Sequence, residues 1–132
     1  MNENDYINSV VGIPYKTGSD GDGSFDCWGI VVDSFRNIEQ IEIPKAVQRE
    51  ECNLNESSVE YLKTWSECTR KDAHIFCCYQ DDMMVHVGRV LCSGRKFLHA
   101  IGDDESGQVR VWNKKTIHTI YNNIRFFKYA TN

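Results

Sequence analysis

The chain has 132 residues, 41% of them hydrophobic and 26% charged, which is the size and composition of one ordinary globular domain, expected to span residues 1–132. The net charge is −4 and the Lys and Arg residues form no basic run, so we expect no nucleic-acid partner. No apolar stretch approaches the roughly 20 residues of a membrane-spanning helix, so we expect no membrane partner either.

The N-terminus and the cysteines indicate where the protein folds. Residues 1–5 are polar and acidic, unlike the cationic start and apolar segment of a secretory signal, so we expect synthesis in the cytoplasm without a signal peptide. Disulfides are rare there, and we expect the six cysteines to be free thiols. No complete set of cysteines and histidines has the spacing of a zinc site, so no metal or other cofactor is expected.

Two short helices are predicted in the first third of the chain. Apolar residues recur at helical spacing over residues 4–11 and 27–35, which indicates one helix in each segment. Residues 17–24 lie between them and contain three glycines, which predicts a loop. Asp26 is a typical N-cap for the second helix, because a carboxylate at this position accepts a hydrogen bond from the backbone of the first turn.

The pattern changes from helix to strand along the rest of the chain. Residues 37–56 are mixed and mostly polar, which predicts a loop, and a capping-box pattern predicts a third helix over 57–67. From Ala73 onward β-branched and aromatic residues dominate, which favours strands. The strands are predicted near residues 73–80, 83–91, 96–101, 108–112 and 124–130. This order is typical of an α+β fold, with N-terminal helices packed on one face of an antiparallel sheet of five to six strands.

Cys27 is the candidate nucleophile, because it falls in the first turn of the second helix. The positive end of a helix favours an anion, and such positions lower a thiol pKa from about 8.5 to about 3.5–7.5. The glycine-rich loop before the helix leaves room for a substrate, and backbone N–H groups nearby are suited to hold a developing oxyanion. The alternative is that Cys27 packs in the core as a small apolar side chain.

Two of the four histidines are predicted in the middle of consecutive strands. If the connection at residues 92–95 is even in length, His86 and His99 share one face of the sheet, with the helix of Cys27 packed over it. An odd connection with a bulge separates them. On a shared face, His86 is suited to take the thiol proton, because Gly88 beside it leaves space for a substrate, and His99 is suited to orient His86. The alternative for either histidine is a hydrogen-bonded core residue.

Four segments resemble, in order, the motifs of the NlpC-type cell-wall cysteine peptidases. The opening motif combines Gly12-Ile13-Pro14-Tyr15 with Phe25-Asp26-Cys27-Trp28-Gly29. The later motifs are Lys71-Asp72-Ala73-His74-Ile75-Phe76, His86-Val87-Gly88-Arg89-Val90 and Phe97-Leu98-His99-Ala100. The resemblance therefore covers about Gly12 to Ile101.

The resemblance implies a papain-like α+β fold and a catalytic triad of Cys27, His86 and His99. Members of the family commonly cleave peptide bonds in peptidoglycan stem peptides, typically after γ-D-glutamyl, and such a stem peptide is the expected substrate. The Cys-Trp-Gly form of the first motif resembles proteins of phage tails and other delivery devices. We therefore expect the protein to act at the bacterial cell wall, carried by a phage tail or a secretion machine whose proteins are its partners.

Four more residues are expected in the oxyanion and substrate-binding region, namely Tyr15, Asp26, Trp28 and Gly88. The resemblance implies that the Tyr15 hydroxyl donates a hydrogen bond near the oxyanion. Asp26 and Trp28 flank the thiol, and the Asp26 carboxylate is expected to cap the helix without taking part in the chemistry.

Two other functions are compatible with the same residues. One is an amidase or acyltransferase of the same fold that acts on another substrate. The other is a structural or interaction component of a tail assembly, in which the site is idle. The reactivity of the Cys27 thiol near pH 6 distinguishes an active site from an idle one, because a packed structural cysteine is not alkylated at that pH.

Overall fold

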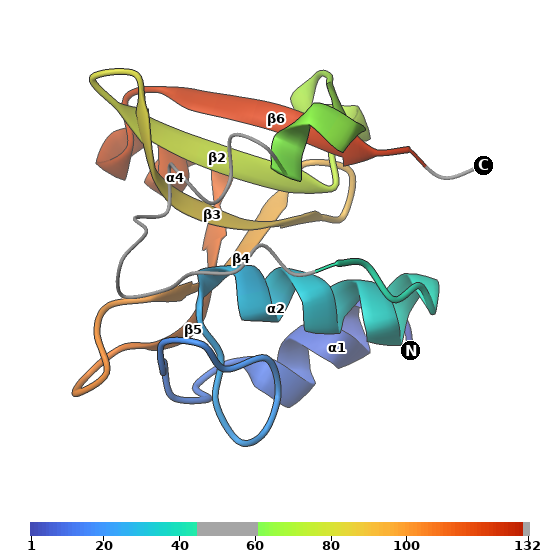
Figure 1. The fold of residues 1–132 in the computed structure, drawn as a ribbon, viewed down its shortest axis with the longest axis vertical. Coiled ribbons are helices and arrows are strands. Elements are labelled where there is room, and N and C mark those ends of the chain that lie inside the picture. The colour runs from blue at the N-terminus through green and yellow to red at the C-terminus, as the bar shows by residue number, and fades with distance from the viewer. Residues whose placement is uncertain (45–60, 131–132) are drawn as a thin grey trace.

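The computed structural model describes residues 1–44 and 61–130. Within these ranges six strands form one antiparallel sheet in the order β1-β6-β2-β3-β4-β5 (Figure 1). The strands are β1 (Trp65–Glu67), β2 (Ile75–Gln80), β3 (Met83–Leu91), β4 (Lys96–Ile101), β5 (Gln108–Asn113) and β6 (Ile124–Tyr129). The helices are α1 (Glu3–Val10), α2 (Cys27–Ser34) and α4 (Lys114–Ile120), with a π-helical turn at Phe35–Glu39 and 3-10 turns at Leu62–Thr64 and Arg70–Asp72.

The predicted α+β class is confirmed, with two corrections to its elements. The helix predicted over residues 57–67 is wrong for residues 65–67, which form β1 and pair with β6 at the edge of the sheet. Residues 45–60, which include most of the predicted loop and the start of that helix, lie outside the described residues. The second correction is α4, a helix that the sequence pattern did not predict.

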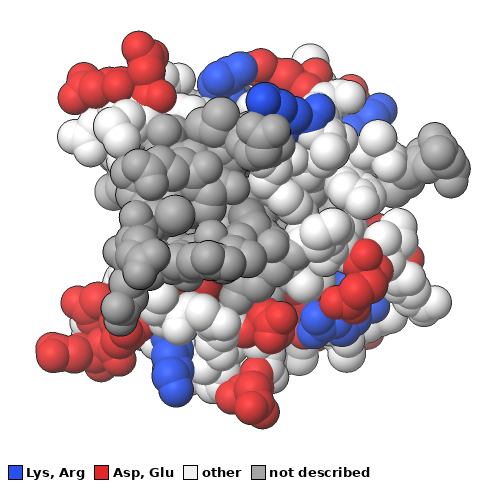
Figure 2. All heavy atoms as spheres, in the orientation of Figure 1, with Lys and Arg blue, Asp and Glu red and all other residues white. Residues whose placement is uncertain are grey.

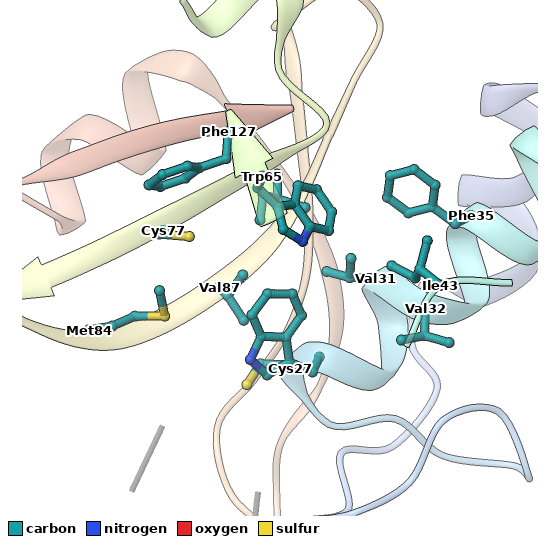
Figure 3. Close-up of a cluster of buried hydrophobic side chains, with 12 residues drawn as sticks. Cys27, Val31, Val32, Phe35, Ile43, Trp65, Cys77, Met84, Val87 and Phe127 are labelled. Carbon is teal, nitrogen blue, oxygen red and sulfur yellow. The ribbon is translucent and has the colours of Figure 1, made fainter. Parts of the chain in front are cut away.

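The two faces of the sheet are covered by different helices. On one face α2 packs against a buried cluster that includes Cys77 of β2 and Val87 of β3 (Figure 3). The neighbouring residues Phe76 and Val90 point to the other face, where they pack with Ile117 of α4. This alternation follows from the period of two along a strand, and it buries β2 and β3 on both faces.

The sheet opens between β3 and β4. These strands pair over only three residues each, 89–91 with 96–98, although β3 pairs with β2 as far as Met83 and β4 pairs with β5 as far as Ile101. In the part of β3 and β4 that contains the predicted catalytic histidines, the two strands are therefore not paired by backbone hydrogen bonds. This separation positions the site described below.

Arg89 fixes α2 on the closed part of this pair. Its guanidinium is 2% exposed and binds the Glu39 carboxylate through both terminal nitrogens. It also donates to the Ser34 hydroxyl at 3.0 Å and lies over the Phe35 ring at 4.2 Å. The π-helical turn after α2 places Glu39 for this ion pair, so the C-terminal end of α2 is attached to β3.

On the described part of the face shown in Figure 2, Lys and Arg side chains and Asp and Glu side chains both occur, and some of opposite sign lie next to one another. Among the described residues, no helix is long and apolar enough to cross a membrane.

Candidate active site

Asp26 begins α2 and holds the glycine-rich loop against it. One carboxylate oxygen accepts a hydrogen bond from the Gly29 N–H at 2.6 Å, and the other accepts one from the Gly18 N–H at 2.8 Å. The first bond confirms Asp26 as the N-cap of α2. The side chain is fully buried and bonded to backbone, and the prediction that it belongs to the substrate-binding region stays a prediction. Asp26 positions the residue that follows it.

Cys27 is the first residue of α2 and is 5% exposed. It lies at the end of the buried cluster between α2 and the sheet, as Figure 3 shows, and it also lines a pocket of about 260 Å³. The other residues that line this pocket are Tyr15, Val85, His86, Ala100, Ile101, Gly102 and Tyr121. The pocket lies where β3 and β4 have separated, so it brings the predicted nucleophile and the predicted base together.

The two predicted histidines are in direct contact. His86 Nε2 and His99 Nδ1 are 2.8 Å apart and hydrogen-bonded. The register of β3 and β4 pairs Arg89 with Leu98 across an even, four-residue turn, which is the alternative that places both imidazoles on one face. With Nε2 bonded to His99, Nδ1 is the nitrogen through which His86 can accept a proton from a thiol.

The position of α2 differs from the prediction. We expected the helix of Cys27 to pack over the face that carries the histidines, but α2 packs against Val87 and Cys77 on the opposite face. His86 and Val87 are neighbours in β3 and point to opposite faces. Cys27 and His86 nevertheless line one pocket, next to the part of β3 and β4 in which the two strands are not paired.

Burial sets the charge of the histidine pair. Burial lowers the pKa of His86 to about 4, and burial together with the charge of His86 lowers the pKa of His99 to about 2. Neither imidazole therefore takes up a proton from solvent at pH 7, and His86 is in the form that accepts a proton from a neighbouring thiol. His99 Nε2 is buried and has no hydrogen-bond partner among the described residues.

Tyr15 lies in the pocket with Cys27, where the sequence placed it. Its backbone N–H donates to the Gly107 carbonyl at 2.9 Å, which fixes the segment before the glycine-rich loop. Burial raises the pKa of Tyr15 to about 12, and the negative charges of Cys27 and Asp26 act in the same direction. The hydroxyl therefore stays protonated at neutral pH, and Tyr15 lines the same pocket as Cys27.

Tyr121 is a pocket residue that sequence reasoning missed. It follows α4, and its ring stacks on the His86 imidazole with centroids 5.5 Å apart and planes 12° apart. Burial raises the pKa of Tyr121 to about 12. No motif marks this position, because it lies after an unpredicted helix and meets His86 only in the folded protein.

Comparison with known proteins gives the family. Residues 12–125 match the NlpC/P60 family. The chain belongs to the NlpC/P60 family. The crystal structure of the NlpC/p60 domain of the peptidoglycan hydrolase SagA is similar, with a TM-score of 0.59 and 15% identity over 96% of this chain and 94% of that chain. No curated protein matches this chain in sequence.

A second solved structure is a lipoprotein-like NLP/P60 family protein from Staphylococcus aureus subsp. aureus Mu50. It matches with a TM-score of 0.58 and 19% identity over 97% of this chain. This chain spans only 40% of that longer protein. The two likenesses confirm the papain-like α+β fold that the sequence motifs implied.

Two predicted substrate-binding residues of this NlpC/P60 chain, Trp28 and Gly88, make close packing contacts. The Trp28 side chain is fully buried and meets the Tyr61 ring edge-on at 4.9 Å. A Cβ on Gly88 would lie 2.6 Å from the Phe76 ring and 2.8 Å from the Cβ of His99. Gly88 therefore allows Phe76 and His99 to pack together, and its place in the substrate-binding region stays a prediction.

Over residues 1–44 and 61–130, the other histidines and the cysteines other than Cys27 do not line this pocket. His74 accepts a hydrogen bond from the Tyr129 N–H at 3.0 Å, and His118 is exposed on α4. Five cysteines lie in the described ranges as free thiols, namely Cys27, Cys68, Cys77, Cys78 and Cys92. Over residues 1–44 and 61–130, no three His, Cys, Asp or Glu side chains are grouped to hold a metal ion.

Proposed function

We propose that the protein is a cysteine hydrolase that cleaves an amide bond in peptidoglycan stem peptides through a thioester intermediate. One observation carries the proposal: Cys27 and His86 line the same pocket, and His86 is hydrogen-bonded to His99 at 2.8 Å. Membership of the NlpC/P60 family and the likeness to a domain of a peptidoglycan hydrolase support this choice of substrate.

The first half of the proposed reaction forms the thioester. The Cys27 thiol gives its proton to Nδ1 of His86, and the thiolate attacks the carbonyl carbon of the scissile amide. The positive end of α2 and the Tyr15 hydroxyl stabilise the negative oxygen that develops. The carbon–nitrogen bond then breaks, and the imidazolium of His86 gives its proton to the leaving amine.

The second half releases the acyl group. The neutral imidazole of His86 takes a proton from a water molecule, and the resulting hydroxide attacks the thioester carbon. The carbon–sulfur bond breaks, the carboxylic acid product leaves, and the Cys27 thiol is restored with the proton held on His86. Throughout the cycle the bond to His99 holds His86 Nε2, so Nδ1 stays directed at the reacting atoms.

The proposal is tested with the variants Cys27→Ala and His86→Gln, with His118→Gln as the exposed histidine control. Soluble peptidoglycan fragments are incubated with each protein, and the products are identified by mass spectrometry. We expect turnover to fall about 10⁴-fold or more in the first two variants, because the nucleophile or the base is lost. Turnover by Cys27→Ala at the wild-type rate would contradict the assignment of the nucleophile.

A second measurement separates an active site from an idle one. Iodoacetamide labelling of Cys27 is followed against pH, with mass spectrometry to distinguish this thiol from the others. We expect an apparent pKa well below the usual 8.5 of cysteine, and a higher value in His86→Gln. A wild-type Cys27 that titrates like a free cysteine would favour a structural role for the domain.

We further propose that the enzyme acts at the bacterial cell wall, where its proposed substrate lies, and that a phage tail or secretion machine delivers it. The Cys-Trp-Gly motif at residues 27–29 supports this proposal. The test is quantitative mass spectrometry of purified virions and culture supernatants against cell extracts. Detection in cell extracts alone would contradict delivery.

A further inference from the structure

The ring of Tyr121 makes the parallel contact to the His86 imidazole. The two planes differ by 12°, whereas the rings of Phe76 and His99 meet His86 at 61° and 58°. Tyr121 also lines the pocket that contains Cys27. The phenol ring therefore lies on the imidazole that would exchange protons with the thiol, in the same cavity.

We propose that Tyr121 is a positioning residue for His86, whose ring holds the imidazole plane and stabilises the imidazolium formed when Cys27 transfers its proton. The hydrogen bond at Nε2 aims the imidazole at His99 but does not by itself set the plane of the ring. A stacked ring restricts that plane and so fixes where Nδ1 points. The aromatic face also attracts a cation, which favours the imidazolium by about 2- to 30-fold.

The contact is built into the fold. Tyr121 donates its backbone N–H to the Ile117 carbonyl at 2.9 Å, and Ile117 is fully buried against the sheet. Tyr121 also packs against the buried cluster that contains Ile117 and Phe76. No substrate is needed to bring Tyr121 onto His86.

The other titratable groups around His86 come from three elements and from the segment before the glycine-rich loop. Cys78 of β2 is its partner across the ladder, His99 of β4 is its hydrogen-bond partner, and Cys27 of α2 and Tyr15 line the same pocket. Burial raises the pKa of Cys78 to about 12 and lowers the pKa of His99 to about 2, so both are neutral at pH 7. Among these groups, the Cys27 thiolate favours the imidazolium by charge, and the Tyr121 ring adds a second favourable contact.

The experiment compares Tyr121→Phe, which keeps the ring, with Tyr121→Leu, which removes it. The control is Ile120→Ser, at the neighbouring residue whose side chain is exposed. The rate of Cys27 alkylation by iodoacetamide is measured from pH 5 to 9. We expect Tyr121→Leu to react about tenfold more slowly at pH 6, with its rise in rate moved to higher pH, because the imidazolium and hence the thiolate are less populated.

Tyr121→Phe is expected to rescue most of this low-pH reactivity, and Ile120→Ser to react like the wild type. The proposal is overturned if Tyr121→Leu has the wild-type pH profile, or if Tyr121→Phe loses as much reactivity as Tyr121→Leu. If Tyr121→Leu does not fold, NMR of the wild-type protein decides. Stacking requires an upfield ring-current shift of the His86 ring protons, and unshifted resonances overturn the proposal.

This inference rests on the proposed function for the role of His86 as the base. The two remain distinguishable, because alkylation needs no substrate. Low-pH reactivity that depends on the Tyr121 ring, without cleavage of peptidoglycan fragments, would contradict the proposed substrate and support the role of Tyr121. If peptidoglycan fragments are cleaved by the wild type but not by Cys27→Ala, and alkylation does not depend on Tyr121, the proposed function is supported and the role of Tyr121 is contradicted.

Discussion

At one end β3 and β4 are hydrogen-bonded and tightly packed, and at the other end they separate around the pocket. The closed end contains residues 89–91 and 96–98, with the Arg89 guanidinium buried in its ion pair with Glu39. The open end contains His86, and here side chains rather than backbone bonds connect the two strands. Within a few residues, the same two strands thus pass from a paired, closely packed region to an unpaired region that borders the pocket.

The difference shows that a pocket at this position requires the ladder between β3 and β4 to stop. A continuous ladder would bring the backbones of β3 and β4 together at His86 and His99 and leave no room for a helix terminus between them. Where the ladder stops, the first turn of α2 and the two imidazoles meet. The closed end then has to fix the relative position of α2 and the sheet, and the buried Arg89 is suited to do so.

The largest effect on stability is expected at the closed end. Glu39→Ala leaves the Arg89 guanidinium buried without its carboxylate, and this costs about 3–5 kcal/mol of unfolding free energy. Glu42→Ala is the matched control, because Glu42 forms a solvent-exposed ion pair with Arg36, and losing such a pair is expected to change stability far less than losing Glu39. Urea unfolding measures both variants.

The double variant Glu39→Ala with Arg89→Met sharpens this prediction. Replacing a buried ion pair by apolar side chains is often neutral, so we expect the double variant to regain most of the lost stability. A Glu39→Ala protein as stable as Glu42→Ala would mean that the closed end does not hold α2 through this ion pair.

A smaller effect is expected at Gly88, where the two ends of the strand pair meet. Gly88→Ala places a methyl group within 2.6 Å of the fully buried Phe76 ring and 2.8 Å from the His99 Cβ. We expect a loss of about 1–3 kcal/mol, because one of these groups must move. If His99 moves, Cys27 alkylation at pH 6 also falls.

Phe76→Leu in the same chain tests whether the clash is with the ring. The double variant Gly88→Ala with Phe76→Leu should be more stable than the sum of the two single variants predicts, since removing ring atoms makes room for the methyl group. Strictly additive losses would show that Gly88 has another role.

The sequence was most informative where a local rule applies. Asp26 caps α2 and Cys27 follows it, because capping depends on residues within one turn. His86 and His99 share a face because the period of a strand and an even turn determine it. The family motifs added the papain-like fold, which the solved structures confirm.

Tertiary contacts decided what could not be predicted. The three-residue strand β1 exists because it pairs with β6, about sixty residues later in the chain. Alternation gives the face of His86 but not the residue at which the β3–β4 ladder ends, so the position of α2 was predicted on the wrong face. The close packing at Gly88 was not predicted either, because nothing in the sequence places Phe76 opposite it.

The smallest expected effect is a dependence of stability on pH that comes from the open end. Burial lowers the pKa of His86 to about 4 and that of His99, with the charge of His86, to about 2, against a usual value of about 6.5 in the unfolded chain. Below pH 6.5 the unfolded chain therefore binds protons that the folded protein does not, so stability falls as the pH falls. We expect a loss of about 1 kcal/mol per histidine between pH 7 and pH 5.5, above the range in which most carboxylates titrate. Urea unfolding of the wild type and of His99→Gln at both pH values measures it, with His118→Gln as the exposed control. An equal loss of unfolding free energy in wild type and His99→Gln would show that the open end does not bury His99 as a neutral group. The open end of the strand pair would then not differ from the closed end in the way it buries titratable side chains.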